Sequence, residues 1–299
     1  MLAIDIGSHS VKLVVARRDA SGLRIEATAM RETPAGAMHG HVVRDPSLIA
    51  DVLRTVARDA RVRTRRAVAA LPGAAVMMRR IPVQAPPGAH LDALVVRAAS
   101  ALVPDALDHA VLDYQVVGAA GPDATRCVLV VAARRDLVRS VTTAIRAAGL
   151  EPCGLDVDVF ALDRLHRDGR DGAPALLVHV GARRADVIFA AADGPVLVGD
   201  VPLDAGRIDA PSLAREVHRL IDLSPIEPAV PPRGVVLSGG AAVADGLGAA
   251  LARRLGCPVA LMEPFRSAGL GPRVDRDALA RSAPAFAVAM GLALRDGLR

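Results

Sequence analysis

The sequence predicts an α/β fold, on three observations. Short apolar runs alternate with amphipathic stretches along the whole chain. The order apolar strand, glycine, polar turn, apolar strand occurs at residues 2–16 and again at 175–191, which indicates an internal duplication. Apolar residues make up 52% of the chain, enough for buried cores and too many for a disordered chain.

The first half predicts an antiparallel start. Leu2–Ile6 and Val11–Ala16 are expected to form strands joined by the turn DIGSHS, and a third strand is expected near Leu23–Met30. Asp45-Pro46 opens a helix, because aspartate caps helix N-termini and proline suits the first turn. The other elements expected here are strands at 67–71, 76–83, 111–117, 127–132 and 155–159, and helices at 90–103, 136–148 and 160–166.

The charged, glycine-rich stretch 166–174 predicts a domain boundary, because such segments form linkers. After it the pattern starts again with strand, turn and strand. The elements expected in this half are strands at 175–180, 186–191, 195–201, 234–237 and 259–261, helices at 211–223, 244–255 and 283–294, and a proline-rich loop at 224–232.

The net charge of +5 and the pI of about 10.0 leave two interpretations open. The arginines are scattered among aspartates, which favours a compositional bias. The alternative is an anionic partner: nucleic acid, an acidic protein or lipid headgroups. A nucleic-acid platform is disfavoured, because the chain has one Tyr, four Phe and no Trp for stacking on bases.

The sequence favours a reducing cytoplasm as the location. The chain has three cysteines, and no two of them have metal-ligand spacing. No apolar run approaches the ~20 residues that span a bilayer. Asp5 and Lys12 interrupt the N-terminal apolar stretch, so no signal peptide is expected.

The turn after the first strand has the composition of a phosphate-binding hairpin. Backbone N–H groups beyond Gly7 and the hydroxyls of Ser8 and Ser10 can donate hydrogen bonds to a phosphate chain. Asp5 would face a Mg²⁺ ion through water, because this ion keeps most of its hydration shell. Lys12, the one lysine among 37 basic residues, would supply a compact charge that the bulkier arginine fork replaces poorly. The alternative is a lysine that survives at a strand edge by chance.

A second glycine turn, LSGGAA at 237–242, lies between a predicted strand and a predicted helix. Gly239 and Gly240 would let a ribose or a flat ring approach the backbone beside a helix N-terminus. Alone this signal is weak, because any tight strand-to-helix turn can contain two glycines.

Seven segments, collinear over most of the chain, resemble the PilM-like type IV pilus assembly proteins of the actin-like ATPase superfamily, which are related to the division protein FtsA. They are IDIGSHSVKLV (4–14), AVAALPGAAVMMRRIPV (67–83), LVVAARRDLV (129–138), AAGLEPCGLDVDVFAL (147–162), VVLSGGAAVADGLGAALARRLGCPV (235–259), EPF (263–265) and APAFAVAMGLALR (283–295).

The resemblance implies a duplicated two-lobe, ribonuclease H-like fold with ATP and Mg²⁺ in the cleft. Lobe 1 would span 1–165 with a small subdomain at about 76–117, and lobe 2 would span 174–299, shortened between 202 and 233. The nucleotide would be held by Asp5, Gly7, Ser8, His9, Ser10 and Lys12 of the first turn and by Gly181, Gly239 and Gly240, with Asp5 next to the metal through water.

The resemblance also implies partners. One is the short cytoplasmic N-terminal peptide of a PilN-like membrane protein, held in a groove of lobe 1, and pilus motor ATPases are others. The protein would then be cytoplasmic and recruited to the inner face of the cell membrane, with no nucleic-acid role.

The sequence departs from the family pattern in three places. His179 stands where active relatives have a carboxylate that orders the metal, and a buried core histidine is an equal interpretation; Arg183 and Arg184 after it could clamp a γ-phosphate or cover the turn. The segment between 202 and 233 is too short to wall an adenine pocket. Residues 98–105 lack the usual pattern of the small subdomain's helix.

Slow or absent hydrolysis is therefore expected. The alternative function is a sugar kinase or phosphatase of the same superfamily, which needs a carboxylate base near the transferred phosphoryl group. Asp5, Asp156 and Asp158 are the candidates for that base.

Overall fold

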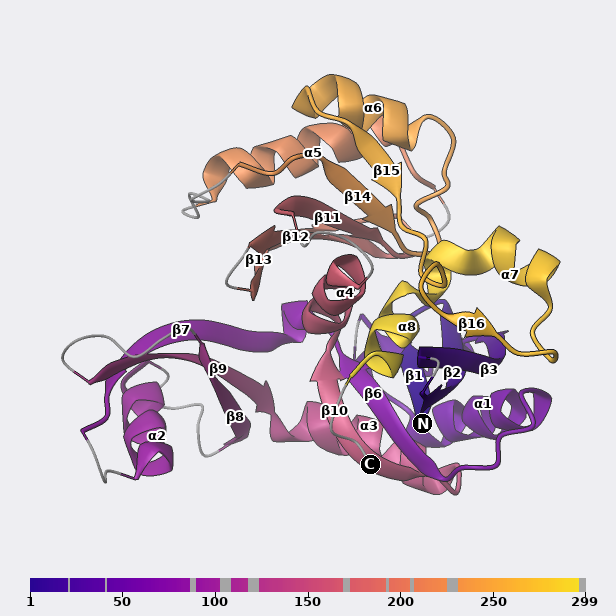
Figure 1. The fold of residues 1–299 in the computed structure, drawn as a ribbon, viewed down its shortest axis with the longest axis horizontal. Helices are drawn as coiled ribbons and strands as arrows, with labels where there is room; N and C mark the ends of the chain where they lie inside the picture. The colour runs from indigo at the N-terminus through magenta and orange to yellow at the C-terminus, as the bar shows by residue number, and fades with distance from the viewer. Residues whose placement is uncertain are drawn as a thin grey trace.

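The computed structural model describes residues 1–20, 22–40, 42–86, 90–102, 109–117, 124–168, 173–191, 194–204, 207–224 and 231–295. They form two large sheets, a three-stranded sheet and a two-stranded pair, with helices on the faces of the large sheets (Figure 1). The predicted α/β class is confirmed. No helix within these ranges is long and apolar enough to cross a membrane.

The first large sheet has six strands in the order β10-β6-β1-β2-β3-β16. One face carries α1 and α3, and the other face carries α4 and α8. The N-terminus of α1 is capped as predicted, because the Asp45 carboxylate accepts hydrogen bonds from the backbone N–H groups of Ser47 and Leu48. The elements are β1 (Leu2–Ile6), β2 (Ser10–Asp19), β3 (Gly22–Glu32), β6 (Arg66–Leu71), β10 (Glu151–Val157), β16 (Gly269–Leu270), α1 (Pro46–Asp59), α3 (Arg135–Ala147), α4 (Asp158–Arg167) and α8 (Ala287–Ala293).

The second large sheet repeats the first. Its order, β13-β12-β11-β14-β15, has the connectivity of β3-β2-β1-β6-β10, which confirms the duplication. Helices α5 and α6 pack on its outer face, and α4 and α8 lie between the two sheets (Figure 1). The elements are β11 (Ala175–Val180), β12 (Arg184–Ala191), β13 (Gly194–Pro202), β14 (Val235–Ser238), β15 (Val259–Leu261), α5 (Ala210–Leu223) and α6 (Leu247–Leu255).

A small sheet projects from the first large sheet (Figure 1). It has the order β7-β9-β8 and packs on α2. The expected range 76–117 is too short for this unit, because its central strand β9 lies beyond it. The elements are β7 (Val76–Gln84), β8 (Ala110–Val117), β9 (Thr125–Arg134) and α2 (Leu91–Leu102).

Several element predictions need correction. The helix expected at 283–294 is divided into a 3₁₀ turn at 283–286 and α8, and α7 (Arg276–Ser282) precedes it. Pro284 lies at the break, because proline cannot donate the hydrogen bond that a continuous helix needs. Helix α4 begins two residues earlier than expected, and the pair β4 (Met38–His39) and β5 (Val42–Val43) was not predicted. Residues 169–172 of the predicted linker, and 205–206 and 225–230 of the shortened segment, lie outside the described residues.

Candidate functional site

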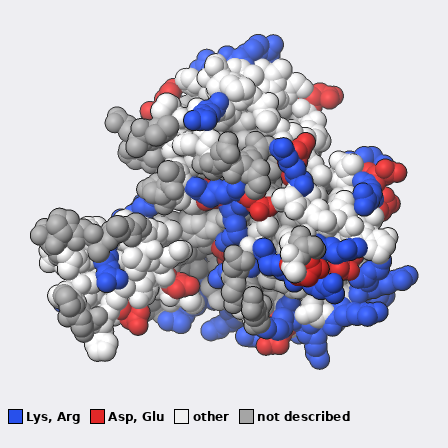
Figure 2. All heavy atoms as spheres, viewed as in Figure 1, with Lys and Arg blue, Asp and Glu red and all other residues white. Residues whose placement is uncertain are grey.

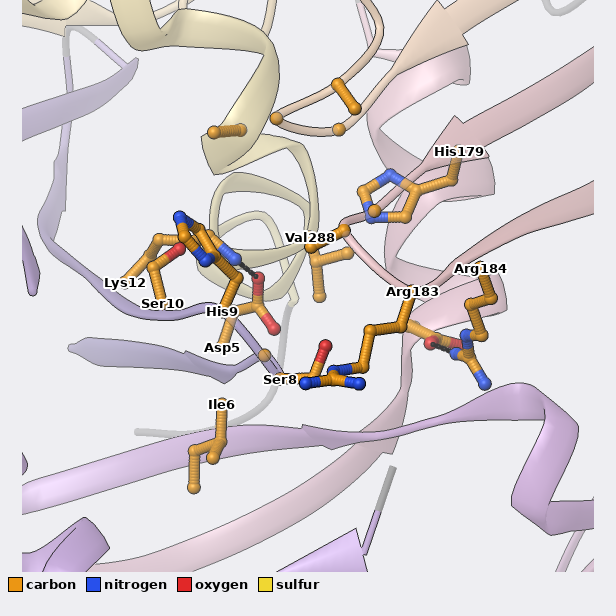
Figure 3. A pocket seen from close by; sticks show the side chains of 18 of the residues that line it. Asp5, Ile6, Ser8, His9, Ser10, Lys12, His179, Arg183, Arg184 and Val288 are labelled. Carbon is orange, nitrogen blue, oxygen red and sulfur yellow. Dashed lines mark hydrogen bonds and ion pairs between the residues drawn. The ribbon is translucent and has the colours of Figure 1, made fainter. Parts of the chain in front are cut away.

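A cavity of about 570 Å³ lies between the two large sheets, at the turns where β1 and β11 end. All nine nucleotide-binding residues expected from the sequence line it: Asp5, Gly7, Ser8, His9, Ser10, Lys12, Gly181, Gly239 and Gly240. Figure 3 shows the first hairpin on one side of this cavity and His179, Arg183 and Arg184 on the other.

The first hairpin is tight and requires its glycine. The N–H of Gly7 donates to the carbonyl of Ser10 at 3.1 Å. A Cβ atom on Gly7 would lie 2.9 Å from that carbonyl oxygen and 3.0 Å from the Lys12 ammonium. Thr33 at the end of β3 holds the turn from the side, because its hydroxyl donates to the carbonyl of Gly7 at 2.7 Å. The turn is therefore a fixed frame beside the cavity.

Lys12 is paired with Asp5 inside this frame. The two residues face each other across β1 and β2, and Lys12 Nζ lies 3.0 Å from Asp5 Oδ2. Their side chains are only 13% and 15% exposed, so water screens the pair weakly. An anion that enters the cavity would meet an ammonium group whose position is already fixed.

The second hairpin has the geometry of the first, 174 residues later. The N–H of Gly181 donates to the carbonyl of Arg184 at 2.9 Å, as the N–H of Gly7 does to Ser10. Arg184 therefore occupies the position that corresponds to Ser10. The hydroxyl donor of the first hairpin is replaced here by a guanidinium.

The same correspondence reveals a residue that sequence analysis missed. His179 pairs with Asp186 across β11 and β12 as Asp5 pairs with Lys12 across β1 and β2. Asp186 is thus the counterpart of Lys12, and it lines the cavity. The sequence contained this signal, because His179 follows Asp5 by 174 residues and Asp186 follows Lys12 by the same number.

His179 is built into the fold as a neutral residue. Its Nδ1 lies 3.0 Å from the hydroxyl of Ser238, which is fully buried at the end of β14. Burial lowers the pKa of His179 to about 4, so the ring is uncharged at neutral pH. This environment matches the core-histidine interpretation and differs from a metal-ordering carboxylate.

Arg184 bridges the two large sheets behind the cavity. Its guanidinium lies 3.1 Å from the carboxylate of Asp158, at the start of α4, and 3.1 Å from that of Asp186 on β12. The other oxygen of Asp158 accepts the N–H of Gly73 at 2.7 Å. Burial raises the pKa of Asp158 to about 6 and that of Asp186 to about 7, because the single guanidinium offsets only part of the desolvation cost.

Arg183 has the opposite environment. It is exposed, lines the cavity and extends from the second hairpin toward Ser8 of the first (Figure 3). The sequence left open whether Arg183 and Arg184 clamp a γ-phosphate or cover the turn. In the structure, Arg184 is engaged by buried carboxylates, and Arg183 has its guanidinium in the cavity.

The second glycine turn closes another side of the cavity. Gly239 has φ +95°, and a Cβ there would lie 2.3 Å from the carbonyl oxygen of Val180. Its N–H donates to the carbonyl of Pro284 at 2.8 Å. Val243, just beyond the turn, also lines the cavity and is 57% exposed. The turn thus needs glycine and leaves an apolar side chain uncovered.

The comparisons with known proteins agree over nearly the whole chain. The family model for the type IV pilus assembly protein PilM matches residues 3–186 and 213–297. The chain belongs to the PilM family. A chain of a solved PilM–PilN type IV pilus biogenesis complex is similar to this one at 26% identity and a TM-score of 0.81, covering 98% of this chain and 97% of that chain.

More distant structures agree with the PilM family on the fold. The cytoplasmic domain of EpsL, an inner membrane component of the type II secretion system of Vibrio cholerae, superposes with a TM-score of 0.53 at 13% identity, covering 99% of this chain and 96% of its own. A Bacteroides thetaiotaomicron protein with an actin-like ATPase fold and unknown function superposes with a TM-score of 0.51 at 8% identity, covering 88% of this chain and 90% of its own. The fold is that of the actin-like ATPases, as the sequence predicted.

For this member of the PilM family, the carboxylates give little support to phosphoryl transfer. Asp156 is absent from the cavity lining and pairs with Arg164 at 3.0 Å. Asp158 lines the cavity, but both of its oxygens are engaged. Among the described residues, no group of three or more His, Cys, Asp or Glu side chains is placed to hold a metal ion. The carboxylates that line the cavity are all engaged by cations, Asp5 by Lys12 and both Asp158 and Asp186 by Arg184.

Proposed function

We propose that this chain is a cytoplasmic, actin-like adaptor of a type IV pilus or related secretion assembly complex at the inner face of the cell membrane. Its main partner is the cytoplasmic N-terminal peptide of a PilN-like membrane protein, and it binds ATP with slow or no hydrolysis. One observation carries the proposal: the similarity to a chain from a PilM–PilN complex extends over 98% of this chain.

The first hairpin supports nucleotide binding. Gly7, Ser8 and Ser10 offer backbone and hydroxyl donors to a phosphate chain, and Lys12 offers a positioned ammonium. The residues fit a triphosphate better than they fit its metal ion. When bound with the nucleotide, Mg²⁺ would neutralise phosphate charge, and Asp5 would face it through water. His179 is a neutral residue where a catalytic carboxylate would be needed, which supports binding without efficient turnover.

Calorimetric titration with Mg·ATP tests this part of the proposal. A charge-assisted hydrogen bond contributes about 1.5–3 kcal/mol, so Lys12→Ala should weaken binding about tenfold or more. Lys12→Arg should also bind more weakly, because its planar fork does not fit next to Gly7. Arg253→Ala, at an exposed arginine near the end of α6, is the control and should bind like wild type. Unchanged affinity in Lys12→Ala would refute the role of the hairpin.

The proposed lobes are 1–165 and 174–299, with lobe 2 shortened between 202 and 233. The two large sheets support the division, although α8 and β16 of the second range pack on the first sheet. The exposed side chain of Val243 supports the proposal that the site lacks a wall on its purine side. Such a site should favour the phosphates over the base, so GTP should bind within about tenfold of ATP in the same titration.

The small sheet offers a place for the peptide. Strand β8 is an edge strand, and Val111 on it is 43% exposed. An extended peptide can add to such an edge through backbone hydrogen bonds, with side-chain contacts to exposed apolar residues. We therefore place the PilN-like peptide along β8.

A labelled peptide from the neighbouring bitopic membrane protein tests this placement by fluorescence anisotropy. Val111→Asp should weaken its binding at least tenfold, because the charge would be desolvated in the complex. Val96→Asp on α2 is the matched control, since Val96 is also an exposed valine of the small subdomain at 50%. Equal loss in both variants, or in neither, would contradict the placement. Capture of pilus motor ATPases is expected to persist in both.

A further inference from the structure

The edge of the first sheet opposite the cavity carries a row of exposed arginines. Strands β10, β6, β1, β2 and β3 present their ends there, because Glu151 aligns with Arg66 and Arg17 with Arg24. Helices α1 and α3 end at the same edge, since they precede the parallel strands β6 and β10. The exposed arginines of this edge, which we call the arginine edge, are Arg17, Arg18, Arg24, Arg58, Arg61, Arg63, Arg65, Arg66 and Arg146.

The arginine edge holds a large excess of positive charge. Nine arginines face four carboxylates among the described residues of this edge, Asp19, Glu26, Asp59 and Glu151, a surplus of five. That surplus equals the net charge of the whole chain, +5. Asp59 is moreover paired at 2.7 Å with Arg31, which is not one of the nine. In Figure 2, blue side chains gather at the lower right, where Figure 1 places the connection from α1 to β6.

The arginines stand on a rigid frame. Five of them lie within residues 58–66, a short connection closed by backbone hydrogen bonds from Arg61 to Arg58 and from Val62 to Ala57, both 2.9 Å. The side chain of Arg65 donates to the carbonyl of Gly149 at 3.0 Å, which ties this connection to the start of β10. With neighbouring strands about 4.8 Å apart, the ends of five strands extend the row over roughly 19 Å.

Contacts within the fold engage some of these arginines, because Arg17 lies 3.5 Å from Asp19, Arg24 lies 3.7 Å from Glu26 and Arg65 is bonded to Gly149. Arg58 and Arg146 lie in the last turns of α1 and α3, where a cation interacts favourably with the helix dipole. The other seven lie outside helices. Their guanidinium groups have the planar donor geometry that binds phosphate oxygens in pairs. The connection 58–66 has no aromatic residue on which a nucleic-acid base could stack.

We propose that the arginine edge docks on the anionic phospholipid headgroups of the membrane. A row of charges at one edge of a sheet can face a plane of phosphates, and basic residues near an anionic leaflet each add to the attraction. The inference rests in part on the proposed function, because a chain held by the short peptide of a membrane protein lies close to the headgroups. The edge is remote from the cavity, so docking would leave the nucleotide site open.

Vesicle co-sedimentation with the full chain tests the proposal. Wild type should bind phosphatidylcholine vesicles that contain phosphatidylglycerol, should not bind phosphatidylcholine alone, and should dissociate as salt is added. The double variant Arg63→Glu, Arg66→Glu should bind at least tenfold more weakly. Its control is Arg253→Glu, Arg254→Glu, the same charge change at the end of α6 in the other half of the chain, and should lose less than twofold.

Three outcomes would overturn the lipid assignment. They are equal binding to both kinds of vesicle, equal loss in the two double variants, and tighter binding of duplex DNA or polyglutamate than of anionic vesicles through the same arginines. Peptide anisotropy on the same variants separates this inference from the proposed function. The edge variant should bind the peptide like wild type, which also shows that it folds, and loss of peptide binding in wild type would count against the adaptor alone.

Discussion

Asp186→Asn tests the buried network around Arg184 through the pH dependence of stability. The folded-state pKa of Asp186 is about 7 against an ordinary value near 3.8, because its side chain is buried next to Asp158. The folded protein thus binds this proton more tightly than the unfolded chain does. The stability this provides is fully present below the ordinary pKa and is lost as pH rises through about 7.

The magnitude follows from the size of that difference. About three pKa units correspond to about 4 kcal/mol at full ionisation. The pKa of about 7 already includes the attraction of Arg184 and the repulsion of Asp158, so neither is deducted again, and the variant has no group that titrates at this position. Part of the total is already lost below pH 5, so we expect the stability of Asp186→Asn relative to wild type to be about 2–3 kcal/mol more favourable at about pH 8 than at about pH 5.

Urea denaturation of both proteins at the two pH values measures this difference. The titration of His179 has the opposite sign over its own range, and it cancels because both proteins contain it. Asp51→Asn, on the exposed face of α1, is the control and should show no such difference. The same relative stability at both pH values would refute the idea that Asp186 carries a costly buried charge.

Three further substitutions probe the packing around the site. Arg184→Met leaves two buried carboxylates without their cation and should destabilise the fold by about 3–5 kcal/mol near neutral pH, and by less in acid, as read from urea denaturation. Gly291→Ala should cost about 3 kcal/mol or more, because its Cβ would lie 1.9 Å from the carbonyl oxygen of Ala161 where α8 crosses α4; a melting temperature equal to wild type would contradict this contact. Ser238→Ala should cost about 1–2 kcal/mol in urea denaturation by leaving His179 Nδ1 unpaired, and no loss would show that water replaces the hydroxyl.

The sequence predicted those parts of the fold that depend on local patterns. The hairpin from Leu2 to Ala16 has two largely buried apolar strands around a glycine turn, and α1 has a cap and a periodic apolar face, so neighbouring residues alone specify them. Strand β16 could not be predicted, because its two residues pair with β3 some 245 positions earlier in the chain. Two residues carry no periodicity, and only tertiary packing gives them their structure.

The candidate site also has parts that could be predicted from the sequence and parts that could not. The residues of both glycine turns were predictable because each turn carries its own composition, and the structure brings them to one cavity. The role of Arg184 was not predictable, because it depends on Asp158 from α4 and Asp186 from β12 lying within reach of one guanidinium. Asp186 could have been found by aligning the two halves residue by residue, which pairs it with Lys12.

That alignment also shows where the two halves differ in chemistry. The first hairpin has kept donors, Ser10 and Lys12, that can receive an anion. At the corresponding positions the second hairpin has Arg184 and Asp186, which bind each other and Asp158. The charged side chains of the second hairpin thus link the two sheets to each other without any ligand. An enzyme of this fold would need its two halves to open and close at each turnover. The proposed adaptor would need surfaces that keep their relative position, and the ion pairs of Arg184 with Asp158 and Asp186 would favour this with or without a nucleotide.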